Sequence, residues 1–338
     1  MKRVFIIPTW EGHFSKNITF LKSCIKFNIN TPVKIVVSNE DEKLNLESLI
    51  SEIPLYEKLD LEIVDIETII SKFKPEIKLS DIEELKLIHQ RVPTIFNSKH
   101  PYQAIKKLYA LRYFDYDNAL LLDSESAFVK ETNMDELFDE YFSNPQIFYT
   151  PHDKINPNLM MFTNASQKCL RWTDVGDVKN MWVFDNMYWM VDKSIFDDML
   201  NDIESNLGVD IYTEFVNNPN EIFEMITYYS YIHINNEKYG YRFVNYYDTI
   251  KDYLKEFFDD YINEKSNRVG GAMEFMFSAV GEKNFDAIFK FINDYKVRFC
   301  RPDYCDTDYY KRATQQSPYL NMIVASENSE SLLNFLNH

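Results

Sequence analysis

Over the first 125 residues, short runs of β-branched and apolar residues alternate with longer helical patterns. The runs 3–7, Val33–Val37 and 61–66 are typical of strands, and 14–27 places its apolar residues on one face of a helix. Alternation of this kind is the signature of βαβ units. The sequence therefore predicts an α/β fold, with a mostly parallel sheet flanked by helices.

The charge balance restricts the ligands that such a fold can take. There are 36 Lys and Arg residues against 53 Asp and Glu, a formal net charge of −17. That charge repels nucleic acid and anionic lipid, so we expect no nucleic-acid partner. A polyanionic ligand would need a local basic pocket or a metal ion.

Several familiar sites are missing from the sequence. Only 7 residues are Gly, and the chain contains no GxGxxG, GxxxxGK or GxSxG motif, which argues against dinucleotide enzymes, P-loop NTPases and serine hydrolases. The 4 Cys residues form no CxxC pair, so neither a zinc ribbon nor a disulfide scaffold is indicated. With no signal-peptide core and no apolar run near the ~18 residues of a membrane span, we expect a soluble cytoplasmic protein.

Two acidic residues follow the most apolar predicted strand. The run 119–122 predicts a strand buried on both faces, and Asp123 and Glu125 come directly after it. If the chain stays extended, residues i and i+2 point the same way, so both carboxylates could hold Mg²⁺ or Mn²⁺ against a diphosphate. The alternative is a helix cap or a solvated turn.

A predicted helix over 102–114 precedes this strand and carries Lys106 and Lys107. Such a helix could point a lysine at a phosphate near the carboxylates, although most surface lysines have no such role. Farther along, Trp182 and Trp189 could stack on the apolar faces of sugars, or could simply belong to the core.

The segment from Lys107 to Glu125 resembles the part of GT-A-fold glycosyltransferases in which a lysine-bearing helix precedes a strand ending in Asp-x-Asp. Here Glu125 replaces the second aspartate. The turns Pro8-Thr9-Trp10 and Ser38-Asn39-Glu40 are similar to those of that fold's nucleotide-binding half. In detail the chain resembles poorly characterised bacterial glycosyltransferase-like proteins found near capsule and lipopolysaccharide loci.

The resemblance implies a GT-A-like, Rossmann-type mixed sheet and a mostly helical C-terminal part. Its catalytic domain would cover 1–249, with a nucleotide-sugar half over 1–128 and an acceptor half over 129–249. Residues 250–338 would form the helical region, where basic residues beside phenylalanines allow at most a peripheral membrane contact.

The resemblance also implies roles for individual residues. The donor would be bound by Thr9, Trp10, Ser38, Asn39, Glu40, Lys107, Asp123 and Ser124. The divalent cation would be held by Asp123, Glu125 and His233, with His152 as a second choice of histidine. The acceptor would contact Trp182, Asn186, Trp189 and Tyr228, and the catalytic residues would be drawn from Glu224, Glu221 and Asp185.

These expectations together describe a metal-assisted glycosyltransferase that moves a sugar from a nucleotide diphosphate to a hydroxyl of a surface polysaccharide or lipopolysaccharide. Two alternatives stay open at this point. One is a metal-dependent nucleotidyltransferase or phosphate hydrolase that uses the same carboxylates. The other is a non-catalytic module that binds glycans or proteins.

Overall fold

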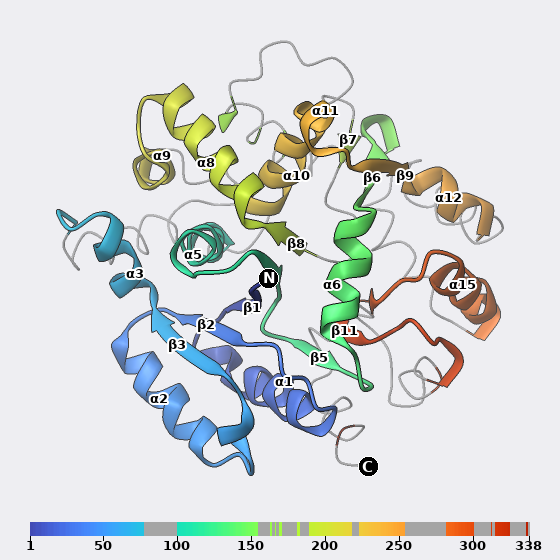
Figure 1. The fold of residues 1–338 in the computed structure, drawn as a ribbon, viewed down its shortest axis with the longest axis horizontal. Helices are drawn as coiled ribbons and strands as arrows, with labels where there is room; N and C mark the ends of the chain where they lie inside the picture. The colour runs from blue at the N-terminus through green and yellow to red at the C-terminus, as the bar shows by residue number, and fades with distance from the viewer. Residues whose placement is uncertain are drawn as a thin grey trace.

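The computed structural model describes residues 1–77, 100–154, 163, 166, 169–170, 181–182, 189–217, 223–253, 282–300, 312, 315–324 and 336. A five-stranded sheet of order β3-β2-β1-β4-β8 forms its centre (Figure 1). These strands are β1 (Arg3–Pro8), β2 (Val33–Val37), β3 (Leu61–Asp65), β4 (Asn118–Leu121) and β8 (Trp189–Asp192). The first four run parallel, and β8 lies antiparallel beside β4.

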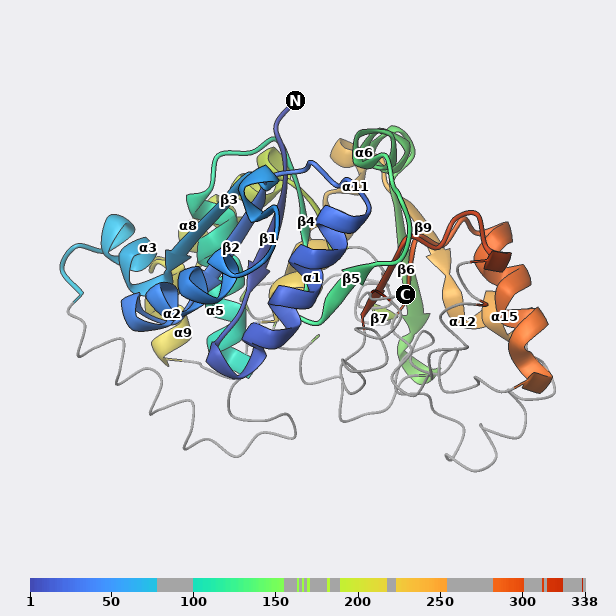
Figure 2. The same ribbon diagram turned by 90° about the horizontal axis from the view of Figure 1, so that it is seen from below.

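Helices cover both faces of this sheet, as expected for strands that are apolar on both sides (Figures 1 and 2). The helices of one face are α3 (Ile66–Phe73), α5 (His100–Tyr113), α8 (Lys193–Leu207) and α10 (Glu224–Ile234). Those of the other face are α1 (Phe14–Lys26), α2 (Glu40–Ser51) and α6 (Met134–Ser143). The predicted fold class, a Rossmann-type mixed sheet flanked by helices, is confirmed.

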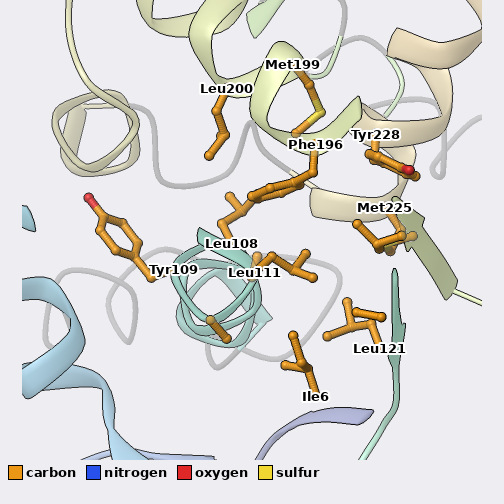
Figure 3. Packing of buried hydrophobic residues seen from close by; sticks show 14 of the residues in the cluster. Ile6, Leu108, Tyr109, Leu111, Leu121, Phe196, Met199, Leu200, Met225 and Tyr228 are labelled. Carbon is orange, nitrogen blue, oxygen red and sulfur yellow. The ribbon is translucent and has the colours of Figure 1, made fainter. Parts of the chain in front are cut away.

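The alternation of side chains along β1 divides the core into two clusters. Val4 and Ile6 point toward α5, whereas Phe5 and Ile7 point toward α1. Figure 3 shows the first cluster, in which side chains of α5 lie between the strands and the α8 and α10 residues. This close packing fixes α5 against the sheet, and α5 carries the two lysines of interest.

Strands β3 and β8 pass directly into the helices that follow them, α3 and α8. Asp65 ends β3 and caps α3 by accepting a hydrogen bond from the Thr68 amide. Asp192 likewise ends β8 and caps α8. Such caps satisfy amides that the first helical turn leaves unpaired, so they fix where each helix begins.

The region beyond residue 249, predicted to be mostly helical, also contributes strands. The described part of it contains α15 (Glu282–Asp294), β10 (Phe299–Cys300) and β11 (Met322–Val324). Strand β11 pairs antiparallel with β5 (Ser126–Phe128), which directly follows the acidic pair in sequence. The C-terminal region is thus joined to the first 128 residues through a three-stranded sheet of order β10-β11-β5.

Ion pairs add to this connection. Lys296 and Arg298, two basic residues that could have faced a membrane, both bind Glu140 of α6. Within the described ranges, no helix combines the length and the apolar character needed to cross a membrane.

A separate group of strands is built on β6 (Gln146–Pro151). It pairs with β7 (Met181–Trp182) and with β9 (Arg242–Asn245) in a separate sheet of three strands. Helix α12 (Tyr246–Tyr253) packs against β6, whereas α9 (Ile211–Asn217) packs against α8 and α11 (Asn236–Tyr239) follows α10. Short 3-10 turns are η1 (Glu11–His13), η2 (Tyr56–Lys58) and η3 (His152–Lys154).

Phe128 on β5 tests how firmly the second sheet is joined to the first. Its ring is fully buried, with centroids 5.7 Å from Phe5 and 5.9 Å from Phe20. We expect Phe128→Ala to lower the free energy of unfolding by about 3–5 kcal/mol, because it leaves a cavity among aromatic rings. Urea denaturation checks this value. The exposed Leu44 provides the control, since Leu44→Ala should change stability by less than about 0.5 kcal/mol.

Candidate functional site

The carboxyl ends of β1, β2 and β4 lie side by side because the three strands are parallel neighbours. The segments that follow them contain most of the residues predicted to bind the sugar donor. Thr9 and Trp10 follow β1, Ser38 and Asn39 follow β2, and Asp123 and Ser124 follow β4 together with the predicted metal ligand Glu125. Ligands of open α/β sheets bind at this edge. Helix α5 packs beside it and sends two adjacent, buried lysines to different strand ends.

Lys106 joins the ends of β1 and β2. Its Nζ atom donates to the backbone oxygen of Thr9 at 2.6 Å and to Oγ of Ser38 at 2.9 Å. The Thr9 hydroxyl in turn donates to Asn17 at 2.5 Å, and its amide pairs with the Val36 carbonyl oxygen. Two of the residues predicted to bind the donor, Thr9 and Ser38, are therefore held by one ammonium group.

Lys107 joins β4 to α10. Its Nζ atom lies 2.8 Å from Oε1 of Glu224 and 3.5 Å from Oδ1 of Asp123, and it sits 4.1 Å from the ring centre of Trp189. Lys107 is 3% exposed and Glu224 is 2% exposed. Charges so deeply buried are tolerated only when they are paired, and the indole face adds a favourable contact with the cation.

The ionisation of Lys107 follows from these neighbours. Burial by itself lowers the pKa of a lysine, but the carboxylates of Glu224 and Asp123 outweigh it and raise the pKa of Lys107 above its ordinary value. Lys107 is therefore a cation at neutral pH, despite its surroundings.

The acidic pair does not have the extended geometry that its spacing predicted. Strand β4 ends at Leu121, and the amide of Ser126 donates to the Asp123 carbonyl oxygen at 3.1 Å, so Asp123 to Ser126 form a turn. The two carboxylates have different partners as a result. Asp123 contacts Lys107 and Gln103, the latter at 3.4 Å, whereas Glu125 accepts from Ser124 at 2.8 Å.

His13, from the turn after β1, reaches the same place. Its Nδ1 lies 2.6 Å from Oγ of Ser124 and 3.8 Å from Oε2 of Glu125. Because the Ser124 hydroxyl donates to Glu125, it accepts its second bond from His13. Trp10 lies against His13 with ring centres 5.3 Å apart, and a Cβ atom on Gly12 would come within 2.3 Å of the indole. Gly12 is thus what allows the half-exposed Trp10 ring to lie here.

Other predicted residues are placed less favourably for their roles. Asn39 caps α2, and the exposed Glu40 in its first turn pairs with Lys43. Tyr228 is buried, and its hydroxyl accepts a hydrogen bond from the Asp192 amide. This placement does not favour the predicted contact with the sugar acceptor. His233 packs on Phe243 and lies nine residues after Glu224 on α10, about 13 Å along the axis, so it is not brought to Asp123.

Some predictions fall beyond what is described. Asp185, Asn186 and Glu221 lie outside the described residues. For Trp182 and His152, only the backbone is described.

Sequence reasoning missed Gln103 and His13. Gln103 precedes Lys107 by four residues, so both lie on one face of α5, and that spacing could have identified it. His13 could not be found in this way, because its position depends on the 3-10 turn Glu11–His13 that follows β1.

The donor set can be compared with the needs of a divalent cation. Among the described residues, no group of three or more His, Cys, Asp or Glu side chains is arranged to hold a metal ion. Mg²⁺, however, is usually held by one or two carboxylates together with substrate phosphates. The carboxylates of Asp123 and Glu125 fit that second arrangement in chemistry and number, provided that the phosphates complete the coordination.

Comparison with known proteins gives distant structural similarities. No family model matches the chain, and no curated protein matches its sequence. Mouse xyloside xylosyltransferase 1 aligns over 72% of this chain and 85% of its own, with 11% identity and a TM-score of 0.36. The galactosyltransferase LgtC aligns over 79% and 84%, with 10% identity and a TM-score of 0.33. The core-mannan synthase of Aspergillus fumigatus, in an Mn/GDP form, aligns over 68% and 68%, with 13% identity and a TM-score of 0.35.

The first two of these neighbours are glycosyltransferases by name and the third is a polysaccharide synthase, but similarity at this level does not identify the function of this chain.

The Lys107–Glu224 pair gives a prediction about stability. Lys107→Met removes the cation that the buried Glu224 and Asp123 share, and we expect it to lower the free energy of unfolding by about 3–5 kcal/mol. Combining it with Glu224→Leu should recover most of that loss, because the apolar side chains need no partner. Urea denaturation of wild type, both single variants and the double variant measures the coupling. Additive losses would contradict the pairing.

The same cycle has an expected pH dependence. Since the pKa of Lys107 is raised on folding, its contribution is fully present below the unfolded-state pKa and is lost as the pH rises through the folded-state value. The difference between wild type and Lys107→Met should therefore stay constant over about pH 6–9 and shrink only at more alkaline pH.

Proposed function

We propose that the chain is a glycosyltransferase that binds a nucleotide-diphosphate sugar at the carboxyl edge of β1, β2 and β4 and transfers the sugar to a hydroxyl group. The observation that carries the proposal is the arrangement on α5, where adjacent lysines contact the ends of all three strands, Lys106 at β1 and β2 and Lys107 at β4. A buried cation beside an acidic turn gives an otherwise acidic protein a place for a diphosphate.

Within this proposal the strand ends have separate tasks. Thr9 and Ser38 would face the nucleoside, with Trp10 beside them. Asp123 and Glu125 would hold a Mg²⁺ or Mn²⁺ ion, which when bound neutralises the charge that develops on the leaving diphosphate. Lys107 would add a fixed positive charge at the same edge, pre-organised by burial rather than recruited from solvent.

The structure favours a positioning role for Glu224 over the predicted role of base. A base must reach the acceptor hydroxyl, whereas Glu224 is almost fully buried and its carboxylate contacts Lys107. Asp185 and Glu221 remain the predicted candidates for the base. Trp189, whose ring lies against Lys107, is proposed to contact the sugar.

The surface-glycan acceptor is proposed from the sequence resemblance alone. The resemblance also supports the choice of sugar transfer over the nucleotidyltransferase and hydrolase alternatives. Analysis of the products separates these reactions, because only sugar transfer releases a nucleotide diphosphate together with an extended glycan.

A thermal-shift experiment tests donor binding. With Mn²⁺ present and a nucleotide diphosphate at one hundred times its dissociation constant, the wild type should be stabilised by about 2.7 kcal/mol. We expect Asp123→Asn to lose most of that stabilisation while still folding, because the amide keeps the shape but not the charge. Asp252→Asn, at an exposed position on α12, should behave like wild type. Undiminished stabilisation of Asp123→Asn would contradict the proposal.

The two-carboxylate arrangement predicts that metal and nucleotide depend on each other. Mn²⁺ alone should bind weakly, and a nucleotide diphosphate should increase its affinity by at least about tenfold, with the reciprocal effect on the nucleotide. The electron paramagnetic resonance signal of free Mn²⁺ measures this directly. Tight Mn²⁺ binding without nucleotide, unchanged in Asp123→Asn and Glu125→Gln, would place the metal elsewhere.

A further inference from the structure

We propose that Lys106 is a positioning residue for the nucleoside part of the donor and acts independently of its neighbour Lys107. This inference rests on the proposed function. It assigns to Lys106 the role of fixing the geometry of the part of the site that would bind the nucleoside. Lys106 would not touch the ligand. It would act through the backbone of Thr9 and the hydroxyl of Ser38.

The contacts of Lys106 support this role. The residue is 3% exposed, and its ammonium group donates to the backbone oxygen of Thr9 and to the hydroxyl oxygen of Ser38, at the ends of neighbouring strands. Both acceptors belong to the segments that would face the nucleoside. Hydrogen bonds from a charged donor are stronger than neutral ones, so Lys106 holds the two segments at a defined separation.

Ser38 and Thr9 each make a further hydrogen bond besides the one to Lys106. The Ser38 amide donates to Glu42 at 2.7 Å, and the Thr9 hydroxyl is bonded to Asn17, a fully buried residue of α1. Each strand end is thus fixed to its own following helix, while Lys106 links one strand end to the other. Without the ammonium, β1 and β2 would still pair, but the segments beyond them would lose their mutual orientation.

Lys107 provides a matched comparison on the same helix turn. It is equally buried, but its contacts are the carboxylates of Glu224 and Asp123, at the end of β4. Loss of Lys107 should therefore weaken binding of the diphosphate part and leave the nucleoside part intact. Loss of Lys106 and loss of Lys107 should therefore affect the affinities for nucleoside and diphosphate differently. A general loss of structure cannot produce that difference.

The experiment compares affinities for a nucleoside and for its diphosphate by ligand-observed NMR and calorimetry. The probes are uridine with UDP, guanosine with GDP and adenosine with ADP, and the pair that binds the wild type is used. The variants are Lys106→Met, Lys106→Arg, Ser38→Ala and Lys107→Met/Glu224→Leu, with Lys22→Met at an exposed position of α1 as the control.

Lys106→Met is expected to weaken nucleoside and diphosphate by the same factor, roughly tenfold, the effect of one lost charged contact. Ser38→Ala should also weaken the binding of both the nucleoside and the diphosphate. Lys106→Arg, which can still donate to both oxygens, should recover part of the loss. The Lys107→Met/Glu224→Leu variant should lose affinity for the diphosphate only, and Lys22→Met should lose neither.

Two results would overturn the inference. If the wild type binds both ligands, and Lys106→Met or Ser38→Ala keeps the nucleoside affinity of Lys22→Met, the positioning role is wrong while the proposed function stands. If the wild type binds none of the six probes, with or without Mn²⁺, the proposed function is wrong and the role of Lys106 falls with it.

Discussion

A buried ammonium group between two carboxylates is the interaction on which the arrangement of this site depends. Lys107 reaches Glu224 on α10 and Asp123 after β4, so one side chain ties a late helix to the end of an early strand. Removing a lysine from water is costly, and the structure compensates with paired charges and the face of Trp189. The position of the acidic turn is therefore set by electrostatics in the interior and not by the strand alone.

The packing around α5 makes that interaction possible. Its apolar residues, among them Leu108 and Leu111, lie between the sheet and the α8 and α10 helices (Figure 3), and this packing fixes the helix that carries Lys106 and Lys107. The second support comes from the other end of the chain. Strand β11 pairs with β5, which fixes the chain just beyond the acidic turn. Residues nearly two hundred positions apart thus hold the same few atoms in place.

Much of the fold could be predicted from periodicity, because β1, β2, β3 and β4 are short apolar runs that the sheet buries on both faces. Strand β5 could not, since its three residues form a strand only by pairing with the distant β11. In the site, the spacing of Asp123 and Glu125 predicted two carboxylates on an extended chain, whereas the structure has a turn from Asp123 to Ser126. Lys107 was identified from its helix. Its ion pair with Glu224, one of three candidates for the base, could not be predicted, because burial and ion pairing are properties of the folded chain. His233 was expected to join Asp123, yet it lies at the far end of α10 from Glu224.

The most direct test of the account is a crystal structure of the protein with Mn²⁺ and the nucleotide diphosphate that binds it. The account predicts anomalous density for manganese beside the carboxylates of Asp123 and Glu125, with the diphosphate against it and the nucleoside at the ends of β1 and β2. A nucleotide bound away from this edge of the sheet, with the Lys107–Glu224 pair and the acidic turn untouched by ligand, would contradict it.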